Sequence, residues 1–439
     1  MPALVRAPAG GYHAGPPPGG APPPEVPAAQ PTPMRKINTR DFKRATRSTS
    51  RDINRKILLN LVREHQPISR ADLARRMEVG RGMVTTLANE LLADGAIMEG
   101  AVGEAPRGRK PTMLFVRTRD RLVVAVDVRF SRTYVMLSDF SGTQLALESF
   151  ETEFDPATLV AEIARRVERL VGTYAAKWQV EGVGLVVPGM VDRASGRILN
   201  SPQLGWRDVD IRDALEEALE LPVQIENAPL ACALAHMWLG ERGDGAGDFV
   251  YVTVSDGVGA GVVVNGQVVR GHGHTAGEFG HVPINPDGPL CLCGSRGCWE
   301  AYTSNLATLA RYLGGQDLSP AENRELLKHH EVTFADLVTR ARTGDARALA
   351  ALRETGRYLG LGLATIVNSM NPSRIVVGGE ITSAWDLVAD LVRAEVEGRA
   401  LTRAAAATPI IPEQTSTHPR LRGATALVAA PVFAAPQVA

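Results

Sequence analysis

Apolar positions in the first quarter of the chain follow helical spacing in three successive segments. The first predicted helix covers residues 53–65, and Pro67 follows it. The second begins after Ser69, a residue type that caps helix N-termini. The third runs from about Arg81 to Ala93 and is closed by Asp94-Gly95. A compact three-helix module is therefore expected near the N-terminus.

Two short apolar stretches, residues 96–98 and 113–116, follow the third helix. The segment between them is rich in Gly and Pro and carries a basic run at residues 107–110, which predicts a β-hairpin with a basic tip. Three helices and a hairpin in this order indicate a winged helix-turn-helix, in which the third helix enters the DNA major groove.

Strands and helices alternate after Asp120 for some three hundred residues. Three consecutive strands are predicted at 122–128, 133–137 and 145–150, and two long helices between about 307 and 370. This alternation favours an α/β fold with two lobes.

Residues 1–34 are of low complexity and contain eleven prolines, a composition that cannot bury enough apolar surface to order itself. The expected organisation is a disordered tail and basic arm over 1–50, a DNA-binding domain over 51–119 and an α/β domain over 120–439.

Composition and charge refine this picture. Hydrophobic residues make up 44% and charged residues 22%, as in soluble globular proteins, and no apolar run could span a bilayer. The N-terminus lacks the order of a secretory signal, so a cytoplasmic protein with no membrane partner is expected. The net charge of zero hides a split, because residues 35–119 contain 19 Lys and Arg against 9 Asp and Glu. Such a basic segment suits a polyanionic partner.

Two groups of side chains are the predicted contacts to a double-stranded DNA operator. The exposed face of the third helix would present its polar residues to base edges, and the hairpin tip would present its cations to phosphates or a narrow minor groove. A small helical domain used for protein contacts is the alternative interpretation. The residues are Arg81, Thr85, Thr86 and Asn89 on the helix, with Arg107, Arg109 and Lys110 at the tip.

Three of the four cysteines lie within eight residues, next to a histidine. His281, Cys291, Cys293 and Cys298 offer one imidazole and three thiolates, which complete a tetrahedral zinc ion with no open position. A structural Zn²⁺ is therefore expected, with reduced buried cysteines as the alternative. Cys232 lies within an apolar helix and is interpreted as a core residue.

Several segments together resemble the ROK family, named for repressors, open reading frames and sugar kinases. The resemblance covers roughly residues 50–430 and implies an actin-like or hexokinase-like, ribonuclease H-like ATPase fold for the second domain. The segments that carry it are Ile68–Ala74, Gly108–Pro111, Val187–Asp192, Asn200–Leu204, Ala276–His281 and Cys291–Glu300.

The resemblance also implies a sugar site. In this family Asn227, Glu278, His281 and Glu300 would bind sugar hydroxyls, and zinc bound to one ring nitrogen of His281 would orient the other towards the ligand. Gln203 stands where the kinases usually have Asn.

Catalysis is not expected, because three features that the resemblance implies for a kinase are missing. The general base is the Asp of an Asn-Asp pair, which here reads Asn227-Ala228. The first phosphate loop carries Arg129 and Phe130 in place of two glycines, and the second carries Asp256 in place of Thr.

The sequence therefore predicts a non-enzymatic repressor of carbohydrate genes, acting as a homodimer or homotetramer and controlled by a sugar or sugar derivative. One alternative is a ROK sugar kinase that phosphorylates a hexose with ATP. Another is a regulator that has lost its response to ligand. The effector and the operator are not specified.

Overall fold

The computed structural model describes residues 46–102, 111–174, 178–240, 247–315 and 318–435. Residues Arg47–Pro436 form one compact unit. The predicted tail and most of the basic arm lie outside the described residues.

The N-terminal part contains three helices and a small sheet. Ser69 caps α2, as predicted, with its hydroxyl accepting from the Asp72 amide at 3.2 Å. Helix α3 has the predicted bounds, and strands β2 and β3 pair antiparallel, with β1 on the other edge of β3. The elements are α1 (Arg47–His65), β1 (Ile68–Ser69), α2 (Arg70–Met77), α3 (Arg81–Ala93), β2 (Ile97–Val102) and β3 (Thr112–Val116).

Helix α1 begins earlier than the sequence analysis places it. It starts at Arg47, so residues 47–50, which were assigned to the basic arm, are helical. Ser and Thr at 48–50 are weak helix formers, but tertiary contact compensates, because Arg51 pairs with Glu90 of α3.

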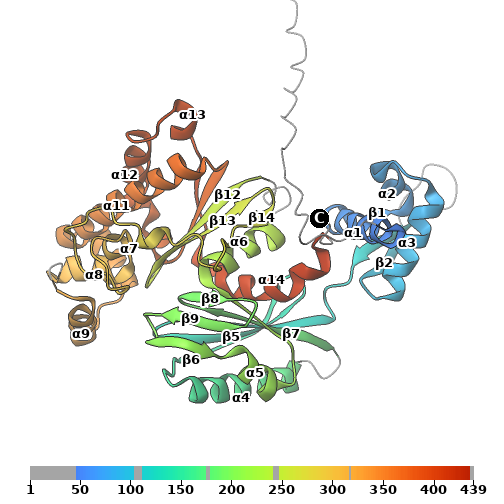
Figure 1. The fold of residues 1–439 in the computed structure, drawn as a ribbon, viewed down its shortest axis with the longest axis horizontal. Coiled ribbons are helices and arrows are strands. Elements are labelled where there is room, and N and C mark those ends of the chain that lie inside the picture. The colour runs from blue at the N-terminus through green and yellow to red at the C-terminus, as the bar shows by residue number, and fades with distance from the viewer. Residues whose placement is uncertain (1–45, 103–110, 175–177, 241–246, 316–317, 436–439) are drawn as a thin grey trace, which may run out of the picture. The chain divides into compact units, whose positions relative to one another are not determined.

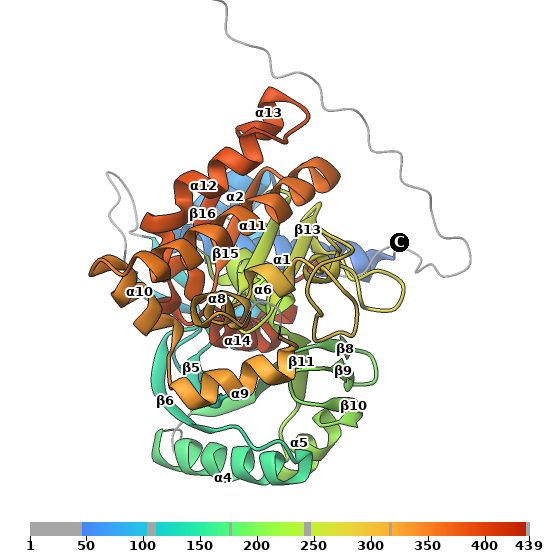
Figure 2. The same cartoon turned by 90° about the vertical axis from the view of Figure 1, so that its left-hand side faces the viewer.

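The first lobe of the α/β part is a five-stranded sheet in the order β11-β7-β4-β5-β6. Helices α4 and α5 cover one face and α6 and α14 the other, as Figures 1 and 2 show. A separate small sheet is formed by β8, β9 and β10. The elements are β4 (Arg121–Val128), β5 (Arg132–Asp139), β6 (Gln144–Glu151), α4 (Pro156–Tyr174), β7 (Gln179–Val187), β8 (Met190–Asp192), β9 (Arg197–Ser201), β10 (Trp206–Asp210), α5 (Arg212–Leu219), β11 (Val223–Asn227), α6 (Ala228–Leu239) and α14 (Pro419–Phe433).

The second lobe is a five-stranded sheet in the order β14-β13-β12-β15-β16. Helix α6 packs on one face, and the largest hydrophobic core of the chain lies on the other. The elements are β12 (Phe249–Val254), β13 (Val258–Val264), β14 (Gln267–Val268), η1 (Phe279–His281), α7 (Glu300–Thr303), α8 (Asn305–Leu313), α9 (Pro320–His330), α10 (Phe334–Arg342), α11 (Ala346–Met370), β15 (Arg374–Gly378), η2 (Glu380–Ala384), α12 (Trp385–Glu397), α13 (Arg403–Ala406), β16 (Ile410–Pro412) and η3 (Thr415–Thr417). The predicted α/β class, with a helical N-terminal part and two lobes, is confirmed.

The prediction of two long helices between 307 and 370 is wrong, because α8, α9, α10 and α11 occupy this stretch. Capping boxes divide it. Ser319 with Glu322 starts α9, and Thr333 with Asp336 starts α10. No helix in the described part of the chain is long and apolar enough to cross a membrane.

Candidate functional site

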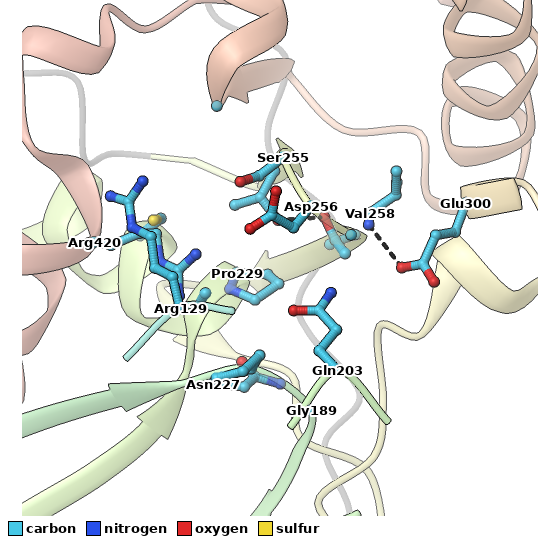
Figure 3. A pocket seen from close by; sticks show the side chains of 18 of the residues that line it. Arg129, Gly189, Gln203, Asn227, Pro229, Ser255, Asp256, Val258, Glu300 and Arg420 are labelled. Carbon is cyan, nitrogen blue, oxygen red and sulfur yellow. Dashed lines mark hydrogen bonds between the residues drawn. The ribbon is translucent and has the colours of Figure 1, made fainter. Parts of the chain in front are cut away.

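A cavity of about 430 Å³ opens beside the N-terminus of α6 and is lined by residues of both lobes. All five predicted sugar-binding residues line it, although they come from widely separated segments. They are Gln203 after β9, Asn227 at the end of β11, Glu278 and His281 around η1, and Glu300 at the start of α7. Figure 3 labels three of them, Gln203, Asn227 and Glu300. The fold thus brings the predicted residues together, while their role as ligands of a sugar stays a prediction.

Glu300 and Gln203 converge over Gly257. A Cβ atom at position 257 would lie 2.5 Å from Gln203 Nε2 and 2.8 Å from Glu300 Oε2, so a larger residue there would displace these two side-chain ends. Glu300 Oε2 also accepts a hydrogen bond from the Val258 amide at 2.9 Å, which Figure 3 draws. Burial raises the pKa of the Glu300 carboxyl. The result is a fixed carboxyl and amide pair at one wall of the cavity.

Asn227 lines the cavity and also caps helix α6. Its Oδ1 accepts from the Leu230 amide at 3.1 Å and so caps α6. With Oδ1 used in this way, the amide NH₂ group remains as a donor for a ligand hydroxyl. A ligand hydroxyl bound by Asn227 would therefore lie next to the first turn of α6.

The four predicted metal ligands form one cluster, with their ligand atoms within 4.8 Å of one another. Cys293 Sγ lies 3.7 Å from Cys298 Sγ, and Cys291 Sγ lies 3.7 Å from His281 Nδ1. Tetrahedral zinc with Zn–S bonds of about 2.3 Å separates two sulfurs by about 3.8 Å. The cluster therefore fits the predicted zinc ion.

The geometry also distinguishes the two nitrogens of His281. Nδ1 faces the cysteine cluster, whereas Nε2 lies 3.9 Å from Glu278 Oε2, and both residues line the cavity. Burial raises the pKa of the Glu278 carboxyl. A metal held by Nδ1 would fix the ring and leave Nε2 for the ligand.

An ion-pair network fills the end of the cavity away from the cysteine cluster. The Asp127 carboxylate is fully buried, with Arg129 Nε at 2.7 Å and an Arg420 nitrogen at 2.7 Å. Arg129 also reaches Glu380 Oε1 of the second lobe at 3.3 Å. Asn305 donates to the other Glu380 oxygen at 3.1 Å. The network therefore ties β4 of the first lobe to η2 and α8 of the second.

A second contact between the lobes comes from the neighbouring residue. The Phe130 ring lies 4.4 Å from the guanidinium of Arg324 on α9. Asp256, on the loop between β12 and β13, also lines this end, and burial raises the pKa of its carboxyl. Charged side chains therefore border the cavity at this end, next to Gly379.

The predicted base-reading residues of α3 all lie on its exposed face. Thr85 and Thr86 bond to backbone carbonyls of their own helix, and Arg70 of α2 lies 3.5 Å from Asn89 Oδ1. Gly82 on the same helix faces open space, which leaves room for close approach of a groove. Arg107, Arg109 and Lys110 lie outside the described residues.

Residues 123–430 match the ROK family. The chain belongs to this family. It is 30% identical over 385 residues to the xylose repressor of Bacillus spizizenii, covering 86% of this chain and 94% of the relative. It is 34% identical over 255 residues to the glucokinase of Halalkalibacterium halodurans, covering 57% and 76%.

Among solved structures, a ROK family transcriptional regulator described as a homolog of the Escherichia coli MLC protein aligns with a TM-score of 0.73. It is 26% identical and covers 88% of this chain and 97% of its own. The ROK match begins at residue 123. The alignments with this regulator and with the xylose repressor cover 88% and 86% of the chain, so both extend into the residues before 123. The hexokinase-like fold expected from the resemblance is confirmed.

Several cavity residues of this ROK chain escaped the sequence analysis. Arg420 and the segment Thr415–Pro419 approach the cavity from the C-terminal end of the chain, and Tyr134 and Tyr251 approach it from two sheets. No local pattern marks them. The one available signal for Arg420 is that a buried carboxylate such as Asp127 needs cationic partners somewhere in the chain.

Proposed function

We propose that this ROK protein is a transcriptional repressor whose operator binding is controlled by a sugar held in the cavity, without phosphorylation of that sugar. The observation that carries the proposal is Ala228 in the cavity wall, directly after Asn227. The family resemblance assigns this position to the general base of the kinases, and a methyl group cannot accept a proton.

The ion-pair network supports the loss of ATP use. Phosphate binding needs backbone amides and cations free to meet the anion. Here Arg129 and Arg420 are already neutralised by Asp127 and Glu380. Deprotonated Asp256 would repel a phosphate further. A kinase that phosphorylates a hexose with ATP remains the alternative, since a glucokinase is among the relatives.

Two features support DNA binding. The xylose repressor matches this chain through most of its length, including part of the three-helix module. The module presents Arg81, Thr85, Thr86 and Asn89 on the open face of α3, where a major groove would lie. A homodimer or homotetramer on a roughly palindromic operator in the cytoplasm accounts for these features together.

The carboxyl, amide and imidazole groups of the cavity suit a polyol, since each can bond more than one hydroxyl. The first candidates are D-xylose and D-glucose, from the names of the relatives. We assign zinc to His281, Cys291, Cys293 and Cys298 as a closed structural site. When bound, zinc supplies a rigid tetrahedral anchor for the loop and fixes the ring of His281.

A pair of measurements on the purified chain tests the proposal. Calorimetry with a panel of aldoses, D-xylose and D-glucose included, should detect binding that Glu300→Gln weakens. A coupled assay of ADP formation with the same sugars should give no turnover. Sustained sugar-dependent turnover that Glu300→Gln abolishes would establish the kinase instead.

A further inference from the structure

Helices α6 and α14 both begin at the cavity. Asn227 caps α6, and Ala228 and Pro229 of its first turn line the cavity. Pro419 and Arg420 of the first turn of α14 line it too, and Arg420 pairs with Asp127. A ligand that enters the cavity would therefore lie next to the N-terminal turns of both helices.

The two helices pack against each other along their length. A Cβ atom at Gly423 would lie 2.5 Å from the Ala231 carbonyl, so the backbones approach closely. Arg422 donates to the Leu239 carbonyl at the end of α6, and Leu234 and Leu427 share one core cluster. Because the interface between the two helices is closely packed, we expect a shift of one helix to displace the other.

The far end of α14 contacts α1 of the N-terminal part (Figure 1). Trp238, near the end of α6, packs against the core that α1 shares. The guanidinium of Arg63 lies 4.9 Å from the ring of Trp238 near the end of α6 and 4.9 Å from the ring of Phe433 at the end of α14. Only 24% of the Arg63 side chain is exposed, and burial lowers its pKa. Arg63 is thus a shared contact of both helices.

The end of α14 is also capped by α1. Asn60 Nδ2 donates to the Phe433 carbonyl at 2.8 Å, and Lys56 Nζ donates to the Val432 carbonyl. These carbonyls have no partner within their own helix, and a cation at a helix C-terminus is stabilised by the helix dipole. Phe433 further packs on Phe140, and both belong to the core that α1, α2 and α3 share with the α/β part.

We propose that the α6–α14 pair transmits sugar binding to the DNA-binding part, and that Arg63 is the residue through which α1 follows both helices. The proposal rests on the proposed function and adds its route of regulation. Helix α6 rises about 18 Å and α14 about 22 Å over their lengths, so each reaches from the cavity wall to the neighbourhood of α1. Arg63 acts as a positioning residue and contacts neither ligand.

The test is the coupling between the two ligands in the full-length chain. The operator is a duplex recovered from a random-sequence pool by the wild type, and the sugar is whichever panel aldose binds it. The ratio of operator Kd with and without saturating sugar defines the coupling, typically 5–150-fold in allosteric proteins. Arg63→Met keeps a long apolar stem and removes the guanidinium, and we expect its ratio to fall to within about twofold of one.

Sugar affinity of the DNA-free variant should stay at the wild-type value, which a general loss of structure would not allow. Arg51→Met is the matched control, because Arg51 lies on the same helix and pairs with Glu90 of its own domain. The coupling ratio of Arg51→Met should equal that of the wild type, because any change in operator affinity that does not depend on the sugar cancels in the ratio. Arg63→Lys keeps the charge without the planar group, so it should also lose coupling and serves if Arg63→Met does not fold.

The double variant with Trp238→Leu and Arg63→Met should show the same coupling ratio as Arg63→Met alone. The reason is that each change removes the same contact, the one between Arg63 and Trp238. Wild-type coupling that survives in both Arg63 variants overturns the relay and leaves the proposed function standing. If no aldose of the panel changes the operator affinity of the wild type, both the relay and the proposed function are overturned.

Discussion

Arg129 Nε lies 2.7 Å from Asp127 Oδ2, and the same guanidinium extends to Glu380 of the other lobe at 3.3 Å. Arg129, which stands where the resemblance places a glycine of the first phosphate loop, is therefore one of the residues that connect the lobes. Phe130 replaces the second glycine and also contacts the other lobe, through Arg324. Both residues that stand at the glycine positions of the resemblance therefore contact the second lobe.

Restoring the missing base should therefore not restore a kinase. Ala228→Asp returns the Asn-Asp pair, and in a site damaged only there a general base could recover about 10²–10⁴-fold in rate. With Arg129, Phe130 and Asp256 still in place, we expect sugar binding without ADP formation. Clear sugar-dependent turnover by this single mutant would mean that the nucleotide site is intact.

Loss of one metal ligand should release the ion. Cys293→Ser should reduce zinc from about one per chain to none by elemental analysis and lower the melting temperature, because the remaining cysteines lose their shared partner. Cys232→Ala is the control, since Cys232 is buried in α6 outside the cluster. Wild-type protein that is folded and free of zinc after purification without chelator would refute the assignment.

The DNA contacts should divide into two kinds. Arg109→Ala, in the basic run between β2 and β3, should weaken binding to every duplex and flatten the dependence on salt, because it removes a phosphate contact. Asn89→Ala, on the exposed face of α3, should weaken binding to the selected operator only. Anisotropy titrations at several salt concentrations measure both. Equal losses on operator and random DNA for Asn89→Ala would contradict base readout.

The half-buried Asp256 carboxyl gives a pH-dependent prediction. Its pKa is raised by burial, so the folded chain binds this proton more tightly than the unfolded chain does. Stability contributed by the protonated group is present at pH below the ordinary Asp pKa and is lost as pH rises through the raised value. Asp256→Asn should therefore gain unfolding free energy over the wild type as pH increases. Denaturant titrations of both proteins at pH 4 and pH 7 measure this; a difference that shrinks with pH contradicts it.

Local signals predicted much of this molecule. The spacing of His281, Cys291, Cys293 and Cys298 is a short-range pattern, and the structure brings their ligand atoms together. The N-cap at Ser69 and the bounds of α3 also follow from short stretches of sequence. Apolar periodicity does not separate the four helices within residues 305–370, whereas Ser319 and Thr333, each followed three residues later by an acidic residue, mark two of their starts.

Other features depend on contacts between distant residues. Arg129 with Glu380, and Asn60 with the Phe433 carbonyl, join segments more than 200 residues apart. No local periodicity encodes such pairs, because they are set by how the lobes close and how α14 returns to α1. The coupling route therefore becomes visible only in three dimensions.

The proposed function is the control of operator binding by a sugar that is not phosphorylated. Its most direct test is the anisotropy of a labelled operator bound to the full-length chain, titrated with the panel aldose that binds and with no ATP present. We predict a saturable change in operator affinity of at least about fivefold, which Glu300→Gln shifts to higher sugar concentration. Operator affinity that stays constant while calorimetry shows the sugar bound would contradict the account.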